Sequence, residues 1–276
     1  MTGAHGGHAR VAAGGRAFDV EYAWVGTRDE RAPVMVFLHE GLGSLSMWKG
    51  FPEALCAATA TRGLVYSRPG YGRSTPRGAR EKWPVEFMHF QARSVLPEFL
   101  AALRVPPRPW LFGHSDGGSI ALLYASAFPD APAGVVAVAP HLFVEDLSVR
   151  NIEAARVAYE THDLRPRLAR YHDDPDSAFF GWNDVWLDPA FRHWNIEDDV
   201  AAIRCPLLAV QGYDDEYGTM AQIDRLAVRV PHAELRKLDR CGHSPHRDQP
   251  ARLIETVAAF MKDNAPGDAR RTVNPS

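Results

Sequence analysis

Three side chains that could carry out nucleophilic catalysis are spread along the chain, each shortly after a segment that reads as a strand. They are Ser115, Asp215 and His243. A serine hydroxyl is a weak nucleophile until a neighbouring base takes its proton, and that base needs an acid that holds its ring in place. The order Ser, Asp, His along the chain suits such a relay. We therefore expect Ser115 to be the nucleophile, His243 the base and Asp215 the acid.

Nearby residues offer alternatives for two of these roles. Asp214 directly precedes the preferred acid, and Glu145 or Asp146 follows a different apolar run. Counted from Gly212, the preferred acid is the fourth residue, which favours it over its neighbour. For the base, His246 lies three residues beyond His243 and could compete with it.

There is a steric reason for the glycines on either side of Ser115. Gly113 and Gly117 stand two residues before and two residues after the serine. A strand that turns sharply into a helix crowds its own backbone, and residues without a Cβ relieve that crowding. Such a turn would raise the serine hydroxyl above the sheet and leave the amide of Asp116 at a helix N-terminus, facing an incoming anion.

Apolar runs and amphipathic segments alternate along most of the chain. The strands and helices that they predict must position Ser115, Asp215 and His243. Continuous apolar runs are typical of strands buried on both faces, so the pattern predicts an α/β domain with a mainly parallel sheet. Sites in such sheets form at the carboxyl ends of the strands. Pro97 is a candidate break in one helix. We expect strands at 18–25 (outer, antiparallel), 33–38, 64–67, 109–112, 134–139, 206–210 and 234–238, and helices at 48–59, 84–103, from the turn to 127, 218–229 and 249–263.

Residues 147–200 differ in composition from the rest of the chain, because aromatic and charged residues are frequent there. A loop of this length without structure would be unusual, so we expect helices, with patterns at 149–160 and 163–172. Most of the aromatic rings should pack this segment onto the main domain, while two or three line an apolar pocket. The region 182–194 is the best candidate for that role.

Length and composition limit the classes of protein. The chain has 276 residues, 46% of them hydrophobic, and a formal net charge of −3. That length suits one large domain, or a domain with an insertion, around a sizeable core. No long basic stripe indicates nucleic-acid binding, and no apolar run approaches a membrane span. We expect neither a nucleic-acid nor a membrane partner.

The three cysteines, Cys56, Cys205 and Cys241, lie far apart and show no metal-binding spacing. Their odd number excludes a full disulfide framework, and they are expected to be reduced and mostly buried in a cytoplasmic protein. We expect no metal and no organic cofactor.

The two ends of the chain lack the patterns of regular structure. Residues 1–17 are rich in Gly, Ala and His, contain no apolar segment of a signal peptide, and are expected to be flexible. A metal-binding role for His5 or His8 is therefore not expected. The tail at 265–276 is expected to be disordered.

The chain resembles the α/β-hydrolase fold family, with a cap inserted after the sixth strand. This resemblance implies core segments at 1–146 and 201–264, a helical cap at 147–200 and a flexible tail at 265–276. It rests on five pieces, which occur in the order Leu38-His39-Glu40-Gly41, Arg68-Pro69-Gly70-Tyr71-Gly72-Arg73-Ser74, Gly113-His114-Ser115-Asp116-Gly117-Gly118, Gly212-Tyr213-Asp214-Asp215 and Cys241-Gly242-His243.

The resemblance also implies roles for particular residues. The family places its histidine directly after a glycine, which favours His243 as the base. The oxyanion hole would use the amide of Asp116 and one from the loop after the second predicted strand, by motif position that of Gly41. His39 would be structural. Glu40 stands where the family commonly has glycine, so the local backbone here departs from the usual pattern.

The expected function is a serine hydrolase that cleaves a small-molecule carboxylic ester through an acyl-enzyme. The same triad would serve a C–C bond hydrolase or an aminopeptidase-like hydrolase. A cofactor-free dioxygenase or a hydrolase-fold ligand receptor could also retain it. The sequence leaves a homodimer open. The residues expected to contact substrate are Glu40, Leu42, His114, Phe143, Trp182 and Trp186.

Acidic residues close to the predicted strand ends suggest one class of substrate. The motif with Asp116 after the serine is similar to that of valacyclovir-hydrolase-like esterases, where this aspartate recognises an amino group. Together with Glu40, its carboxylate would favour a cationic substrate. The alternative is that these acids pair with arginines such as Arg68, Arg73 and Arg247.

Overall fold

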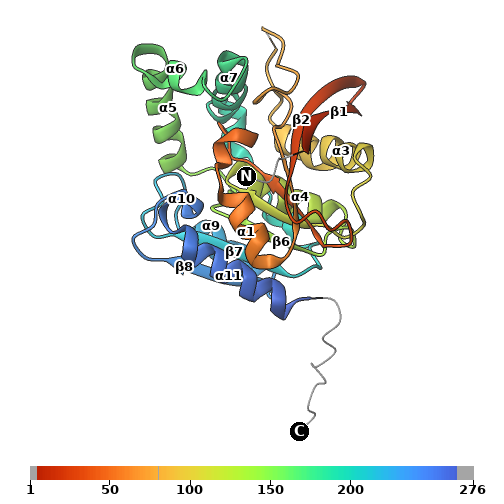
Figure 1. Ribbon diagram of the computed structural model, residues 1–276. Helices are drawn as coiled ribbons and strands as arrows, with labels where there is room; N and C mark the ends of the chain where they lie inside the picture. Colours follow the sequence, from red (N-terminus) through yellow and green to blue (C-terminus); the bar gives the residue numbers. More distant parts are fainter. Residues whose placement is uncertain (1–4, 80, 266–276) are drawn as a thin grey trace.

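The computed structural model describes residues 5–79 and 81–265, and within them eight strands form one sheet (Figure 1). The strand order across the sheet is β1-β2-β4-β3-β5-β6-β7-β8. Pairing is parallel from β4 through β8, and β2 runs antiparallel to β1 and β4. The strands are β1 His5–Ala13, β2 Arg16–Gly26, β3 Val34–Leu38, β4 Arg62–Tyr66, β5 Trp110–His114, β6 Gly134–Val138, β7 Leu207–Gly212 and β8 Glu234–Leu238.

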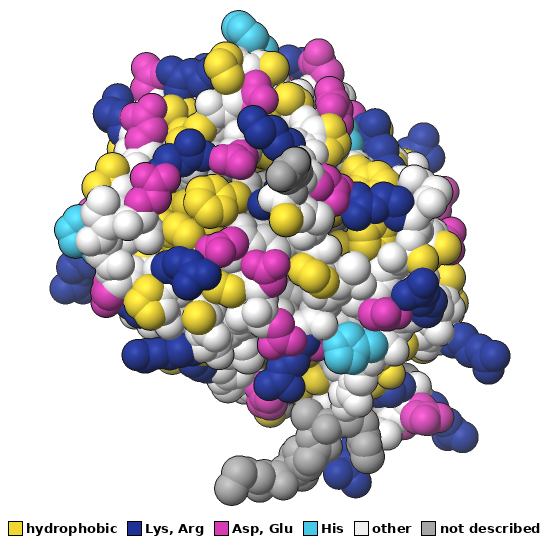
Figure 2. Space-filling model, turned by 90° about the horizontal axis from the view of Figure 1, so that it is seen from above, with side chains coloured by type: hydrophobic (Ala, Val, Ile, Leu, Met, Phe, Trp, Pro, Cys, Tyr) yellow, Lys and Arg dark blue, Asp and Glu magenta, His cyan; other side chains and the backbone are white. Residues whose placement is uncertain are grey.

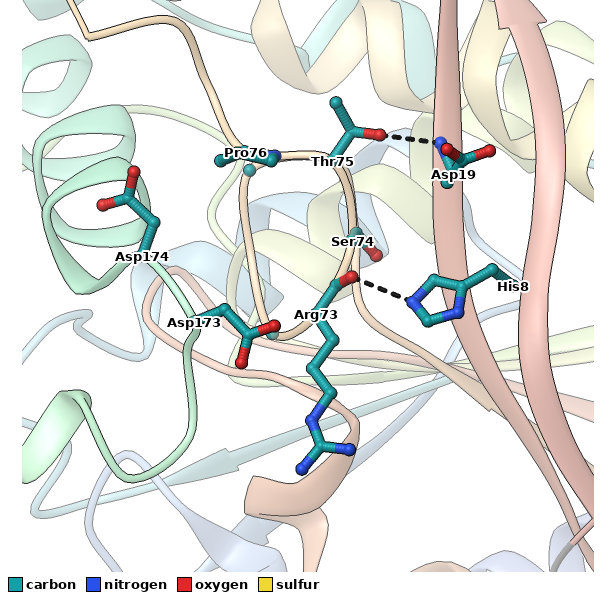
Figure 3. Close-up of a pocket in the computed structure, with 10 residues that line it drawn as sticks. His8, Asp19, Arg73, Ser74, Thr75, Pro76, Asp173 and Asp174 are labelled. Atoms are coloured by element: carbon teal, nitrogen blue, oxygen red, sulfur yellow. Dashed lines mark hydrogen bonds between the residues drawn. The ribbon is translucent and has the colours of Figure 1, made fainter.

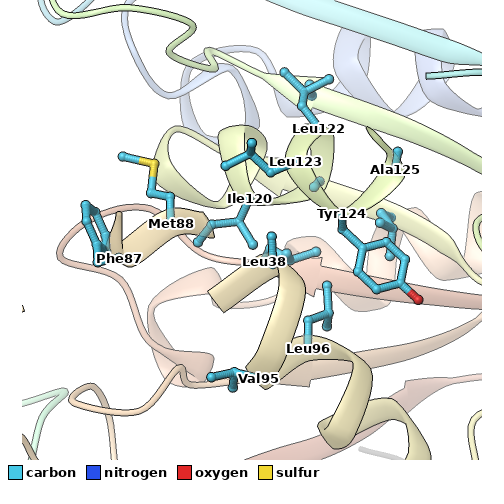
Figure 4. Close-up of a cluster of buried hydrophobic side chains, with 14 of the residues drawn as sticks. Leu38, Phe87, Met88, Val95, Leu96, Ile120, Leu122, Leu123, Tyr124 and Ala125 are labelled. Carbon is cyan, nitrogen blue, oxygen red and sulfur yellow. The ribbon is translucent and has the colours of Figure 1, made fainter. Parts of the chain in front are cut away.

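Helices cover both faces of the sheet and bury its central strands completely, which confirms the predicted α/β hydrolase fold. One face packs against α1 (Phe51–Thr59) and α11 (Pro250–Asp263). The opposite face packs against α3 (Leu96–Ala102), α4 (Asp116–Ala127) and α9 (Ala221–Arg229). In Figure 4, Ile120 and Leu123 of α4 lie close to Leu38 of β3 and Leu96 of α3.

The segment between β6 and β7 forms a separate group of helices above the carboxyl ends of the strands (Figure 1). We call residues 146–200 the cap. Some of its rings pack on one another: Tyr159 stacks on Phe179 with centroids 3.8 Å apart. Others reach the core, since Trp186 lies 4.8 Å from the ring of His141 and Phe191 lies 6.2 Å from that of Phe87. The cap helices are α5 Asp146–Thr161, α6 Leu164–Leu168, α7 Pro175–Trp186, the 3-10 turn Pro189–His193 and α8 Glu197–Val200.

The helix expected at 84–103 runs through Pro97 without a break. It consists of α2 (Phe87–Phe90), a π-helical turn (Gln91–Val95) and α3. Proline is the second residue of α3, where the preceding wide turn leaves room for a residue without an N–H. The helix expected at 48–59 instead begins as a 3-10 turn at Leu45–Trp48, followed by α1.

The expectation of a flexible segment at 1–17 was wrong for its described part. Strand β1 pairs with β2 along its whole length, through a turn at Gly14 and Gly15, whose φ angles are positive. The missed signal is the alternation of Ala9, Val11 and Ala13, which all point into the core. Residues 266–276, expected to be a disordered tail, lie outside the described residues.

No described helix combines the length and the apolar character that crossing a bilayer requires. The remaining short helix of the core, α10 (Pro245–Asp248), follows β8 and leads into α11.

Candidate active site

Ser115 sits at the sharp junction of β5 and α4, in a backbone conformation rare for residues other than glycine, with φ of 53° and ψ of −121°. The flanking glycines make this turn sterically possible. A Cβ on Gly113 would lie 2.2 Å from the carbonyl oxygen of Gly117, and one on Gly117 would lie 2.1 Å from that of Leu38. The strained turn holds the serine side chain above the sheet, at the carboxyl end of β5.

Ser115, His243 and Asp215 form one chain of hydrogen bonds. The Nε2 atom of His243 lies 2.9 Å from Oγ of Ser115, and its Nδ1 lies 2.9 and 3.0 Å from the two carboxylate oxygens of Asp215. Both interactions are satisfied when Nδ1 carries the ring proton, which leaves Nε2 free to accept from the serine hydroxyl. The three side chains follow β5, β8 and β7, so the parallel sheet itself brings them together.

The carboxylate of Asp215 is held from several sides. The backbone amides of Tyr217 and Gly218 donate to Oδ1 at 2.8 and 3.1 Å, and the side-chain amide of Gln211 donates to Oδ2 at 2.6 Å. Burial raises the pKa of Asp215, but the hydrogen bond and charge of His243 and the amide donors outweigh it, so the pKa is lowered. Asp215 is therefore an anion at neutral pH.

The pKa of His243 is shifted in the opposite direction to that of Asp215. Burial lowers its pKa, but the hydrogen bond and charge of Asp215, with further contributions from Glu216 and Glu40, raise it above its ordinary value of 6.5. A histidine with a pKa near working pH can both accept and return a proton. The ring is also in contact with His141, whose pKa is lowered by burial to about 3, so that neighbour stays neutral.

The structure does not bring the alternative acids and base to the serine. Asp214 is exposed. Glu145 accepts hydrogen bonds from Thr219, and Asp146 pairs with Arg192. His246 packs among Trp48, Phe51 and His114, and burial lowers its pKa to about 2.

The two amides expected to form the oxyanion hole belong to Gly41, which lines the pocket together with Ser115, and to Asp116, the residue after Ser115. Neither the amide of Gly41 nor that of Asp116 donates a hydrogen bond to another described residue. The loop that carries Gly41 is fixed from below: His39 Nδ1 donates to the carbonyl of Glu40 at 2.7 Å, and its Nε2 accepts from the amide of Arg68 at 3.0 Å. His39 is thus part of the scaffold beneath this loop.

Arg68 was not expected as a site residue, except as a partner for an acid. Its fully buried guanidinium donates to the carbonyl of Glu40 at 2.9 Å, lies 3.8 Å from Oδ2 of Asp116 and stacks over the ring of Tyr71. It therefore touches both segments that carry the free amides. Only its position in the Arg-Pro-Gly segment after a predicted strand could have indicated this role.

The carboxylate of Asp116 lies beneath the pocket instead of facing it. It is fully buried and accepts from the indole N–H of Trp186 at 3.2 Å. Burial raises its pKa to about 6, against the lowering effect of Arg68 and Trp186. This geometry favours the pairing alternative over recognition of a substrate amine by Asp116.

Glu40 does line the pocket, but it too has partners in the protein. Its carboxylate lies 3.3 Å from Arg247 and 3.6 Å from Nδ1 of His114. Burial raises the pKa of Glu40, but the hydrogen bond and charge of His114 and the charge of Arg247 hold it well below its usual range. Its negative charge is thus already compensated by the protein.

A pocket of about 460 Å³ opens in front of Ser115, between the cap and the carboxyl ends of the strands. Of the residues expected to contact substrate, Glu40, Leu42, His114, Trp182 and Trp186 line it. Phe143 does not: its ring lies under the guanidinium of Arg225, away from the pocket. Its other apolar or aromatic lining residues are Met47, His141, Ile152, Leu164, Leu168, Tyr171 and Tyr217. Charged residues other than Glu40 line it as well, namely Arg167, Glu216 and Arg247.

Another hollow, of about 660 Å³, lies between the β1–β2 hairpin and the loop after β4 (Figure 3). Its walls are tied together by hydrogen bonds from His8 to the carbonyl of Arg73 and from the amide of Asp19 to Thr75. Ser115, His243 and Asp215 are all absent from its lining. Its position separates it from the chemistry described above.

Charges of both signs are mixed on one face of the molecule. On the face seen from above, basic, acidic and apolar side chains are interspersed, and neither sign of charge dominates (Figure 2). Within the described part of the chain, no group of three or more His, Cys, Asp or Glu residues is arranged to hold a metal ion. All three cysteines are buried and unpaired.

Comparison with known proteins places the chain in a family. The model of the alpha/beta hydrolase family matches residues 35–256. A pimeloyl-[acyl-carrier protein] methyl ester esterase of Aromatoleum aromaticum is 26% identical, over 82% of this chain and 98% of that protein. The monoacylglycerol lipase ABHD6 of Rattus norvegicus is 22% identical over 64% of this chain, and the match spans only 62% of that lipase.

A solved structure shows the same fold. A thermophilic esterase from Thermogutta terrifontis superposes with a TM-score of 0.70, at 18% identity, over 93% of this chain and 98% of that one. The family match extends over most of the sequence and includes the turn at Ser115 and the strand ends that carry Asp215 and His243. This chain belongs to the alpha/beta hydrolase family and is an enzyme of that family.

Proposed function

We propose that this enzyme hydrolyses a small-molecule carboxylic ester through a covalent acyl-enzyme on Ser115. The observation that carries the proposal is the hydrogen-bonded chain from Ser115 through His243 to Asp215, beside a pocket whose wall includes a group of apolar and aromatic residues. The esterase and lipase names of the relatives are in keeping with the same bond type.

The first half of the reaction forms the acyl-enzyme. Oγ of Ser115 attacks the ester carbonyl while Nε2 of His243 takes its proton, and the anion of Asp215 stabilises the imidazolium. The carbonyl oxygen becomes an oxyanion, and the free amides of Gly41 and Asp116 donate to it. His243 then gives its proton to the departing alkoxide, so that an alcohol leaves.

The second half repeats these steps with water. His243 takes a proton from a water molecule, whose oxygen attacks the acyl carbonyl, and the same two amides stabilise the second oxyanion. Collapse returns the proton to Oγ of Ser115 and releases the carboxylic acid. The apolar pocket wall would hold the carbon skeleton of the substrate during both halves.

A fluorophosphonate probe and a panel of p-nitrophenyl esters test this proposal. The probe should label the wild type once, and Ser115→Ala should abolish both labelling and ester turnover. Ser119→Ala is the matched control, because that serine lies one turn later and already donates to the carbonyl of His141. It should retain labelling. Turnover that persists in Ser115→Ala, or none of the esters being hydrolysed, would contradict the proposal.

A further inference from the structure

A groove of about 580 Å³ opens directly beside the active-site pocket. It runs between α6 and the segment after it in the cap and, in the core, the start of α1, the helix α10 and the start of α11. Four residues line both hollows, namely Met47, Arg167, Tyr171 and Arg247. The groove, which we call the mouth groove, is therefore an extension of the pocket, and a single ligand can occupy both.

The charged residues of the mouth groove all have the same sign. Lys49, Arg167, Arg170 and Arg247 line it, and none of its described lining residues is Asp or Glu. The neighbouring His246 is held neutral by burial. The groove contrasts with the mixed surface seen in Figure 2, where both signs of charge are interspersed.

Two of the four cations have an acidic partner, and two have none in the described part of the chain. Arg167 lies 3.8 Å from Asp163, which is 76% exposed, and Arg247 pairs with Glu40. Lys49 and Arg170 take part in no ion pair among the described residues. The groove therefore carries a net positive charge, which attracts an anion and raises its local concentration.

Lys49 is also positioned, and not simply exposed. Its ammonium donates to the hydroxyl of Tyr171 at 2.8 Å and lies 4.3 Å from the centroid of that ring. Tyr171 belongs to both hollows, so this contact fixes a positive charge at the junction between them. An anion there would find an oriented donor at its boundary with the pocket.

The mouth groove is also connected to the catalytic histidine by short contacts. Arg247 lies 3.3 Å from Glu40, whose other oxygen lies 3.6 Å from Nδ1 of His114. The Nε2 atom of His114 in turn donates to the carbonyl of His243 at 2.7 Å. A ligand that binds Arg247 is thus held a few side chains from the reacting serine.

We propose that the mouth groove binds an anionic group, a carboxylate or a phosphate, on the same substrate whose ester carbonyl lies at Ser115. This inference rests on the proposed function and adds the class of substrate. The apolar residues of the pocket would hold the chain between the two groups. The assignment reverses the expectation of a cationic substrate, because two acids at this site already have cationic partners: Glu40 pairs with Arg247, and Asp116 lies beside Arg68. A third acid that lines the pocket, Glu216, accepts a hydrogen bond from the backbone amide of His243.

Matched esters test the charge preference. Monomethyl esters of straight-chain dicarboxylic acids are compared with their ω-amide, ω-ammonium and methyl-alkanoate counterparts of equal length, and an ω-phosphonate series separates phosphate from carboxylate. We expect kcat/KM to be at least about tenfold higher for the anionic esters than for the neutral ones, and lowest for the cationic ones. The preference should depend on chain length and shrink as salt is raised from about 0.05 to 0.5 M.

Substitutions in the mouth groove test whether its cations cause the preference for anionic esters. Lys49→Gln and Arg170→Gln should each reduce the anionic preference about two- to fivefold, and the double variant should reduce it further. Turnover of neutral p-nitrophenyl butyrate serves as the reference in every variant. Lys262→Gln, on the exposed face of α11, lines neither hollow and should leave the preference unchanged.

The outcomes separate this inference from the proposed function. Hydrolysis of neutral esters with no anionic preference, or a preference that survives in the Lys49→Gln/Arg170→Gln double variant, overturns the inference and leaves the esterase proposal intact. Calorimetric titration of Ser115→Ala with monomethyl octanedioate and with methyl octanoate decides the question without turnover. Tighter binding of the anionic ester, lost in the added double substitution, supports the inference; equal binding of the two overturns it.

Discussion

At the scale of single residues, the two adjacent acids in the turn after β7 have different environments. Asp215 is buried and accepts hydrogen bonds from His243, Gln211 and two backbone amides, whereas Asp214 is exposed. The sequence alone left both open as the acid. Their different contacts allow one direct test of the assignment.

Asp215→Asn should lower kcat by roughly four orders of magnitude with little change in KM, by analogy with the triad variant that serves as the general example. The physical reason is that an amide in place of the anion favours the wrong tautomer of His243 and no longer stabilises its charged form. Steady-state kinetics on p-nitrophenyl butyrate measures the effect. Asp214→Asn is the matched control and should remain within about twofold of the wild type. Equal losses in both variants would refute the assignment of Asp215.

The raised pKa of His243 predicts the acid side of the activity profile. His243 must be neutral to take the proton of Ser115, so kcat/KM falls as the pH drops below the pKa of His243 in the free enzyme. Burial alone would lower that pKa, but Asp215, Glu216 and Glu40 raise it, so the half-maximal point should lie above pH 6.5. Glu216→Gln should shift this point to lower pH, because it removes one of the raising charges. A half-maximal point below 6.5 in the wild type would contradict the assignment.

At the scale of elements, the approach of α4 to β3 depends on a missing side chain. A Cβ on Gly117 would lie 2.1 Å from a backbone carbonyl of Leu38, and backbone cannot move aside as a flexible side chain can. Gly117→Ala should therefore displace α4, lower stability by about 1–3 kcal/mol and reduce kcat, since the amide of Asp116 begins that helix. Urea unfolding and steady-state kinetics measure both effects.

Gly118→Ala is the control for this prediction. It lies on the same helix turn, but its nearest neighbour would be a side-chain atom of Pro140 at 3.2 Å. The smaller clash should cost less stability and less activity. Equal losses in the two variants would contradict the prediction that the contact between Gly117 and Leu38 is the more restrictive one.

The elements that carry the site could be predicted from sequence because their patterns are strong. Continuous apolar runs gave the central strands, and Ser115 and Asp215 follow two of them, whereas His243 follows the edge strand β8. Strand β1 was missed because its glycines and histidines have low strand propensity, and pairing with β2 overrides that preference. The positions of Phe143 and of the Asp116 carboxylate depend on tertiary contacts with Arg225 and Arg68, which no local pattern encodes.

At the scale of the whole molecule, the hairpin of β1 and β2 closes one edge of the sheet and part of the core. Val11 is 1% exposed within the main hydrophobic cluster, whereas its neighbour Ala12 faces solvent. Val11→Asp should destabilise the protein by roughly 3 kcal/mol or more, because it buries an unpaired charge. Ala12→Asp should stay within about 0.5 kcal/mol of the wild type. Urea unfolding distinguishes the two, and a small loss in Val11→Asp would mean that β1 adds little to the stability of the core.

The buried pair of Arg68 and Asp116 also constrains how this sequence can change. Each side chain compensates the charge of the other in a site closed to water, so removing either one should cost about 3–5 kcal/mol. The combined variant Arg68→Met/Asp116→Asn should lose less stability than the sum of the two single variants, which a double-mutant cycle by urea unfolding measures. Additive losses would refute this coupling.

Positions 68 and 116 are therefore expected to change together in evolution. A scan of single substitutions would score both as essential, although neither side chain touches the reacting atoms. A descendant of this sequence can replace the pair only by changing both residues together, or by passing through an ancestor that barely folds.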